Sequence, residues 1–108
     1  MITNEQQRAE VFVDAGIRVL DAKKYGWFKR VNLNRFDARD FHRCPLAHAY
    51  GDYNKGLAAI SVRSVSEAAT LGFALGSELM HWDTLNSIWL RKIRERRAGI
   101  TSHRSSRH

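Results

Sequence analysis

Apolar side chains recur at intervals of three and four residues in several stretches of this 108-residue chain. Such spacing gathers them on one face of a helix, whereas strict alternation would indicate a strand. The two clearest series are Leu46, Tyr50, Tyr53, Leu57 and Ile60, and Leu79, Trp82, Leu85, Trp89 and Ile93. Helices with an apolar face must bury it against one another, so we predict an all-α fold, a small bundle of about four helices.

The first helix is predicted over residues 4–24. Thr3 and Gln6 have the spacing of a capping box, which starts a helix, and an apolar series follows. Gly26 is suited to the left-handed conformation that closes a helix. Residues 26–40 then mix apolar side chains with Asn and Asp, and we interpret them as an ordered connector.

A second helix is predicted to begin near Cys44, because Pro45 fits the first helical position. Gly51 and Gly56 each cost about 1 kcal/mol relative to Ala inside a helix. A continuous helix to Ile60 and a break at Gly51 and Asp52 are therefore both open.

Two further helices complete the predicted bundle. Ser64 and Glu67 form a second capping box before a short helix. Ser77 or Asp83 is expected to cap the last helix, which should end between residues 97 and 99. We therefore expect one helical domain over residues 1–99 and a disordered, flexible basic tail over residues 100–108.

Positive charge is concentrated at the C-terminal end of the chain. Residues 1–90 hold eleven Lys and Arg against ten Asp and Glu, a net of +1, whereas residues 91–108 hold seven against one, a net of +6. A field of this kind attracts phosphate backbones or acidic protein surfaces.

The candidate binding residues in this region are Arg91, Lys92, Arg94, Arg96 and Arg97. As a nucleic-acid interface they would contact phosphates, and we expect Arg94, Arg96 and Arg97 to face solvent. An acidic protein is the other possible partner. Alternatively, the cations only compensate the helix dipole at a solvated helix end.

The three tryptophans are assigned from their positions. Trp82 and Trp89 lie on the apolar series of the last helix, so we place them in the core. Trp27 follows a glycine in the connector, beside Lys29 and Arg30, and is the candidate for exposure. We include Trp27, Lys29 and Arg30 in the predicted partner-binding surface.

The sequence predicts no enzyme, no cofactor and no metal site. His42, Cys44 and His48 have a spacing that fits no known zinc pattern, and a Cys44–His48 nucleophile pair rests on residue types alone. We expect Cys44 to be a small buried apolar residue, and a single cysteine forms no internal disulfide. Phosphate-binding glycine loops and hydrolase motifs are also absent from the sequence.

The expected location is the cytoplasm. The N-terminal residues lack the pattern of a signal peptide, and no apolar run approaches the ~20 residues that cross a bilayer.

Several short motifs resemble those of a group of small uncharacterised proteins encoded by actinobacterial phages. They are Gly26-Trp27, Cys44-x-Leu46, Gly51-Asp52-Tyr53, Gly56-Leu57, Leu71-Gly72-Phe73 and a late Trp89, within residues 16–96. The resemblance implies a phage accessory protein, made in the host cytoplasm, that binds and redirects a host component. It carries no catalytic residues.

The leading hypothesis is therefore a non-enzymatic protein of phage type that binds a host cytoplasmic protein. The alternative is a nucleic-acid-binding protein that uses the basic C-terminal helix. A third hypothesis is a self-assembling protein that forms a homodimer.

Overall fold

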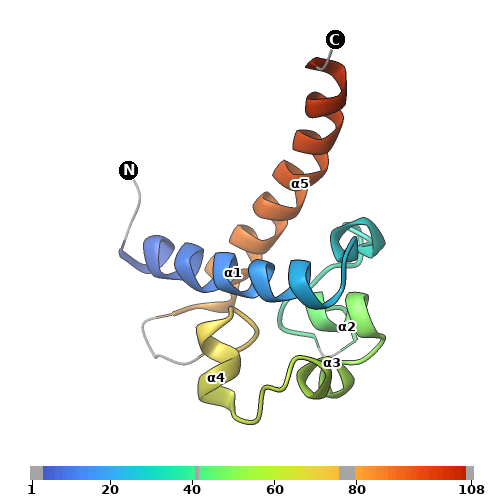
Figure 1. Ribbon diagram of the computed structural model, residues 1–108. Coiled ribbons are helices and arrows are strands. Elements are labelled where there is room, and N and C mark those ends of the chain that lie inside the picture. Colours follow the sequence, from blue (N-terminus) through green and yellow to red (C-terminus); the bar gives the residue numbers. More distant parts are fainter. Residues whose placement is uncertain (1–3, 41, 76–79, 107–108) are drawn as a thin grey trace.

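The computed structural model is a set of helices joined by loops (Figure 1). It describes residues 4–40, 42–75 and 80–106, with side chains as far as Gly99. The elements are α1 (Asn4–Lys23), the 3-10 helix η1 (Trp27–Arg30), α2 (Pro45–Tyr50), α3 (Tyr53–Ala59), α4 (Val65–Thr70) and α5 (Trp82–Ser106). No strand occurs within these ranges, so the predicted all-α class is confirmed.

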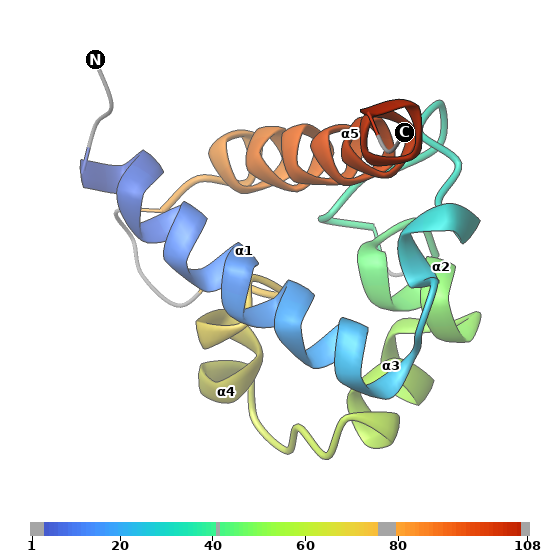
Figure 2. The same ribbon diagram turned by 45° about the horizontal axis from the view of Figure 1, so that its top comes forward.

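The two long helices, α1 and α5, pack against each other and organise the rest of the fold. In Figure 2, α5 runs at an angle to α1 along one side of the molecule, and α4 lies below α1. Helices α2 and α3 pack together, and η1 contacts both α2 and α5. The C-terminal turns of α5 rise clear of the other elements in Figure 1.

Trp89 of α5 lies at the centre of the core and is 0% exposed. Its indole Nε1–H donates to the Gly72 carbonyl at 2.7 Å. The Phe73 ring stacks on it at a centroid distance of 5.5 Å, and Trp27 meets it edge-on at 6.0 Å. The predicted burial of Trp89 is confirmed, whereas Trp82 is only partly buried against the core.

Two glycines allow the chain after α4 to approach α1 closely. A Cβ at Gly16 would lie 2.0 Å from the Leu71 carbonyl oxygen, a distance that no side chain tolerates. Gly72 has a φ of +77°, and a Cβ there would lie 3.1 Å from the Cα of Val13. The segment that accepts the Trp89 hydrogen bond therefore packs directly on the α1 backbone.

The second predicted helix is divided, as the alternative reading of the sequence allowed. Gly51 ends α2 with a φ of 91°, which is left-handed. Asp52 caps α3, because its side chain accepts from the backbone N–H groups of Asn54 and Lys55. The predicted start at Pro45 is confirmed, and Cys44 is buried as expected.

Helix starts and ends follow the sequence signals with two exceptions, which are Asp83 at the start of α5 and the C-terminal end of the same helix. Ser64 Oγ accepts from the Glu67 N–H at 3.1 Å, which confirms Ser64 as the cap of α4, while Thr3 and Ser77 lie outside the described residues. Asp83 is not a cap, because α5 begins at Trp82 and Asp83 lies in its first turn. The carboxylate of Glu5 instead accepts from the His81 N–H at 2.7 Å, just before α5.

Helix α5 runs to Ser106, beyond the end predicted at residues 97–99. Gly99 keeps a helical backbone, and nothing lies within 4 Å of its Cβ position, so it does not act as a stop. Ala and Arg around it favour the helix, and Arg near the C-terminus also suits the helix dipole. The flexibility of residues 100–108 and the domain boundary at 99 stay predictions.

The predicted connector over residues 26–40 is ordered, as expected. Val31, Phe36 and Ala38 are buried in the core. The Ala38 N–H donates to Asn86 Oδ1 of α5 at 2.7 Å, which ties the connector to the last helix. Among the described residues, no helix combines the length and apolar character needed to cross a membrane.

The close approach at Gly16 generates a stability prediction. Gly16→Ala should lower the free energy of unfolding by about 1–3 kcal/mol or more, because the methyl group must push the Leu71 backbone away from α1. Gly99→Ala is the matched control in an open helical position, and it should be neutral or stabilising by up to about 1 kcal/mol. Urea unfolding of both variants measures the difference, and equal effects would contradict the close packing.

Candidate functional site

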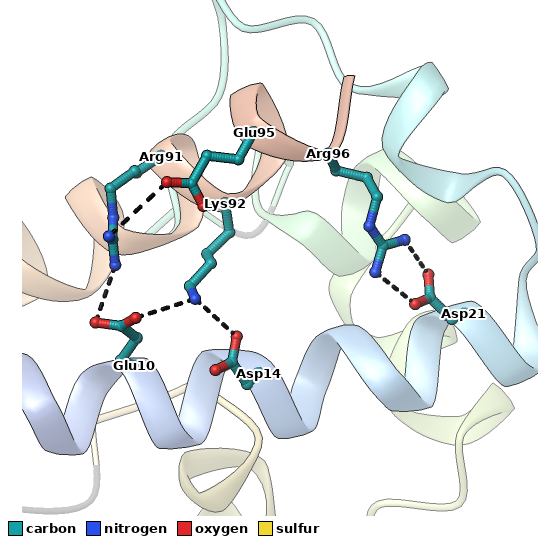
Figure 3. Close-up of polar contacts among 7 residues, drawn as sticks. All are labelled: Glu10, Asp14, Asp21, Arg91, Lys92, Glu95 and Arg96. Atoms are coloured by element: carbon teal, nitrogen blue, oxygen red, sulfur yellow. Dashed lines mark hydrogen bonds and ion pairs between the residues drawn. The ribbon is translucent and has the colours of Figure 1, made fainter. Parts of the chain in front are cut away.

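A basic face of α5 lies against an acidic face of α1 (Figure 3). Lys92 Nζ is 3.1 Å from Glu10 Oε1 and 3.2 Å from Asp14 Oδ1. Arg91 Nη2 is 3.0 Å from Glu10 Oε2, and Arg91 Nη1 is 3.9 Å from Glu95 Oε2 within the same helix. The bonds from Lys92 and then Arg91 hold the pKa of Glu10 below its usual value. Both cations are therefore engaged within the molecule.

Arg96 forms a bidentate ion pair with Asp21 near the C-terminal end of α1. Its Nη1 and Nη2 lie 2.8 Å and 2.7 Å from the two carboxylate oxygens. The Trp27 indole N–H also donates to Asp21, at 2.9 Å. The pKa of Asp21 is lowered chiefly by Arg96 and also by Trp27, despite the opposing effect of partial burial. The Arg96 guanidinium carbon sits 5.3 Å from the Phe28 ring centroid, in a cation–π contact.

Arg97 joins α5 to the start of the connector. Its Nε and Nη2 donate to the Phe28 carbonyl at 3.2 Å and 2.9 Å, and Nη2 also donates to the Val31 carbonyl. The Phe28 carbonyl lies within η1 and the Val31 carbonyl directly after it, at a helix end whose last carbonyls have no intrahelical donor. Arg97 thus supplies the donors that this part of the chain lacks.

The expectation that Arg94, Arg96 and Arg97 all face solvent is wrong for two of the three. Arg96 and Arg97 bond to α1 and to the connector, as described above. Arg94 is exposed and pairs with no acidic side chain in the part of the chain that the structure describes. Four of the five cations proposed as phosphate contacts are therefore bonded to other parts of the molecule.

Trp27 is 1% exposed, so its proposed exposure is wrong. It packs edge-on against both Phe28 and Trp89, with ring centroids 6.0 Å apart in each pair. Its polar N–H group is satisfied by Asp21, which removes the usual penalty for burying an indole. Trp27 therefore belongs to the core and cannot contact a partner directly.

Tyr25 is the exposed aromatic residue of this region, at 93% exposure, and the sequence analysis missed it. It stands between the end of α1 and Gly26, whose φ of 79° reverses the chain there. The available signal was its place just after the last apolar position of the helix and directly before a glycine suited to the left-handed region. The turn sends Trp27 into the core and leaves Tyr25 in solvent.

Tyr25 borders a cavity of about 480 Å³, which we call the corner pocket. Its lining residues are Asp21, Tyr25, Gly26, Phe28, Lys29 and Arg96. Lys29 and Arg30 follow on η1 and are exposed, and neither pairs with an acidic side chain of a described residue. We call Tyr25, Lys29 and Arg30 the corner surface. The structure therefore brings the predicted residues Lys29, Arg30 and Arg96 to one end of the molecule.

The His42, Cys44 and His48 group has local structural contacts. Cys44 caps α2, where its Sγ accepts from the Ala47 N–H at 3.4 Å, and burial raises the pKa of its thiol. His48 Nδ1 lies 3.1 Å from the Cys44 carbonyl oxygen, and its ring stacks on Phe36. No three metal-ligating side chains come together among the residues that the structure describes.

The Asp21–Arg96 pair generates a pH prediction. The folded-state pKa of Asp21 is lowered, so its contribution to stability is present above the unfolded value of about 3.9 and is lost as the pH falls through the folded value. Asp21→Asn should lower stability at pH 7 and reduce the loss of stability below about pH 4. Thermal unfolding between neutral and acidic pH measures both effects.

Glu67→Gln is the control for this measurement, because Glu67 is exposed on α4 and glutamine keeps the capping-box pattern. It should leave the acidic slope close to that of the unmodified protein. An unchanged slope in Asp21→Asn would show that the carboxylate is not held by Arg96 in solution.

No family model matches this chain, and neither a curated protein nor a solved structure matches it.

Proposed function

We propose that this protein is a non-enzymatic binding protein that engages another protein through the corner surface. The observation that carries the proposal is Tyr25, which is 93% exposed on a closed turn beside a cavity of about 480 Å³. Tyrosine and arginine are enriched among the residues that dominate protein interfaces, because they bring a large contact area and hydrogen-bonding groups. Lys29 and Arg30 add positive charge at the same place.

The position of the basic residues favours a protein partner over a nucleic acid. A helix that grips phosphates needs free cations, and each phosphate contact releases counterions. Arg91, Lys92 and Arg96 are already paired with carboxylates of α1, so phosphates would have to compete with those ion pairs. The corner surface, by contrast, offers an aromatic side chain and cations without a competing acidic partner among the described residues.

The resemblance to proteins of actinobacterial phages supports a more specific version of the proposal. The partner is then a host protein, and the protein acts in the host cytoplasm by redirecting that partner. A nucleic acid bound through Arg94 and the projecting end of α5 is the competing function, and a homodimer through the same corner is the third.

The proposal is tested by placing a photo-crosslinking amino acid at position 25. In lysate of an actinobacterium, irradiation should give one dominant protein adduct, identified by mass spectrometry, that persists after nuclease treatment. The matched control carries the same group in place of Val65, which is 66% exposed on α4, and it should not give that adduct. The purified partner should then bind the unmodified protein, and Tyr25→Ala should weaken binding by at least about tenfold, as expected for an interface residue of this type.

Three outcomes would overturn the proposal. An adduct of equal yield from positions 25 and 65 would indicate non-specific contact. Loss of the adduct on nuclease treatment would indicate a nucleic-acid partner, and a crosslink only between two copies of this chain would indicate self-assembly.

A further inference from the structure

We infer that the corner pocket receives an apolar side chain from an acidic segment of the partner. The inference rests on the proposed function and adds the chemistry of the ligand.

The walls of the pocket provide apolar surface for a side chain. Tyr25 supplies an exposed aromatic ring, the largely buried Phe28 contributes a small part of the lining, and Gly26 adds no side chain between them. Nothing lies within 4 Å of the Cβ position of Gly26, so this part of the pocket is open. A volume of about 480 Å³ is large enough to admit an aromatic or aliphatic side chain together with part of its backbone.

The charges around the pocket favour a partner segment in which acidic residues flank that side chain. Asp21 is its acidic lining residue, and its carboxylate already accepts from Arg96 and from Trp27. Lys29 and Arg30 are exposed and have no acidic partner among the described residues, and the same holds for Lys23 at the end of α1. Opposite charge on the partner is favoured, and like charge is repelled at such a rim.

The walls are held in place before a ligand arrives. The carbonyl of Phe28 accepts two bonds from Arg97 of α5, and its ring lies under the Arg96 guanidinium. Trp27, the next residue along η1, is anchored in the core. A prearranged site loses little conformational entropy on binding, which favours recognition of a short segment.

A single-stranded nucleic acid is the competing ligand, because bases stack on exposed aromatic residues beside cations. The pocket favours the peptide. A stacking base needs only the outer face of Tyr25, whereas the concave wall of Phe28 and Gly26 is filled by a side chain that projects from its backbone.

The test uses a library of random peptides displayed on phage particles, selected on the immobilised full-length protein. We expect the enriched peptides to combine aspartate or glutamate with an aromatic or large aliphatic residue. The best peptide, labelled with fluorescein, is then titrated against the protein by fluorescence anisotropy, and an oligothymidylate of similar length is titrated in parallel.

Variants of the protein report on each part of the site. The double variant Lys29→Glu, Arg30→Glu should bind the peptide about tenfold or more weakly. The binding that remains should depend less on the salt concentration. Arg63→Glu is the matched control, an exposed charge reversal between α3 and α4, and should change affinity by less than about twofold. Replacing the apolar residue of the peptide with alanine should cost about tenfold.

Other results would overturn the inference. Enrichment of basic peptides would show that the pocket does not bind an acidic segment. The same conclusion would follow if the selection enriched peptides equally on the unmodified protein and on the double variant. If the alanine peptide binds as tightly as the selected peptide, no apolar side chain occupies the pocket. If oligothymidylate binds more tightly than the peptide, and Tyr25→Ala abolishes that binding, the ligand is a nucleic acid. If position 25 still crosslinks to a host protein, only the ligand chemistry is wrong, whereas loss of both results refutes the proposed function as well.

Discussion

The hydrogen bond from the Trp89 indole to the Gly72 carbonyl lies where three parts of the chain meet. Trp89 belongs to α5, Gly72 follows α4, and Gly72 in turn packs on the α1 backbone at Val13. Because the indole is fully buried, its N–H group needs a partner, and the left-handed backbone at Gly72 turns a carbonyl toward it. This contact fixes the position of α5 relative to α1.

The charges of the two long helices depend on that position. With α5 seated on α1, Lys92 reaches Glu10 and Asp14, and one turn later Arg96 reaches Asp21. Partly exposed ion pairs of this kind each contribute little, roughly 0–1 kcal/mol, so they follow from the packing and do not create it. Their larger effect is on function, because most of the cations of α5 are paired with carboxylates of α1 and are not available to a ligand.

Local signals in the sequence predicted the elements, and contacts between distant residues explain what the sequence could not predict. Pro45 as the first residue of α2 and Ser64 as the cap of α4 each act within a few residues, and both are confirmed, whereas Leu79 of the last apolar series lies outside the described residues. The ion pair of Arg96 joins residues 75 positions apart, and a helix pattern contains no information on which face of another helix it will meet. The basic stretch therefore looked like a free surface, and Trp27 looked like an exposed residue.

The turn at Gly26 explains why Tyr25 is the exposed aromatic residue and Trp27, which was predicted to be exposed, is buried. Gly26 reverses the chain, so the residues on either side of it point to opposite environments. Trp27 is the residue drawn inward, because its ring meets Trp89 and its N–H meets Asp21. Asp21 also holds Arg96, so the turn that carries Tyr25 is tied to both long helices. The backbone that carries Tyr25 is therefore anchored before binding, and for that reason the corner is a better binding surface than the basic helix, whose cations are mostly paired.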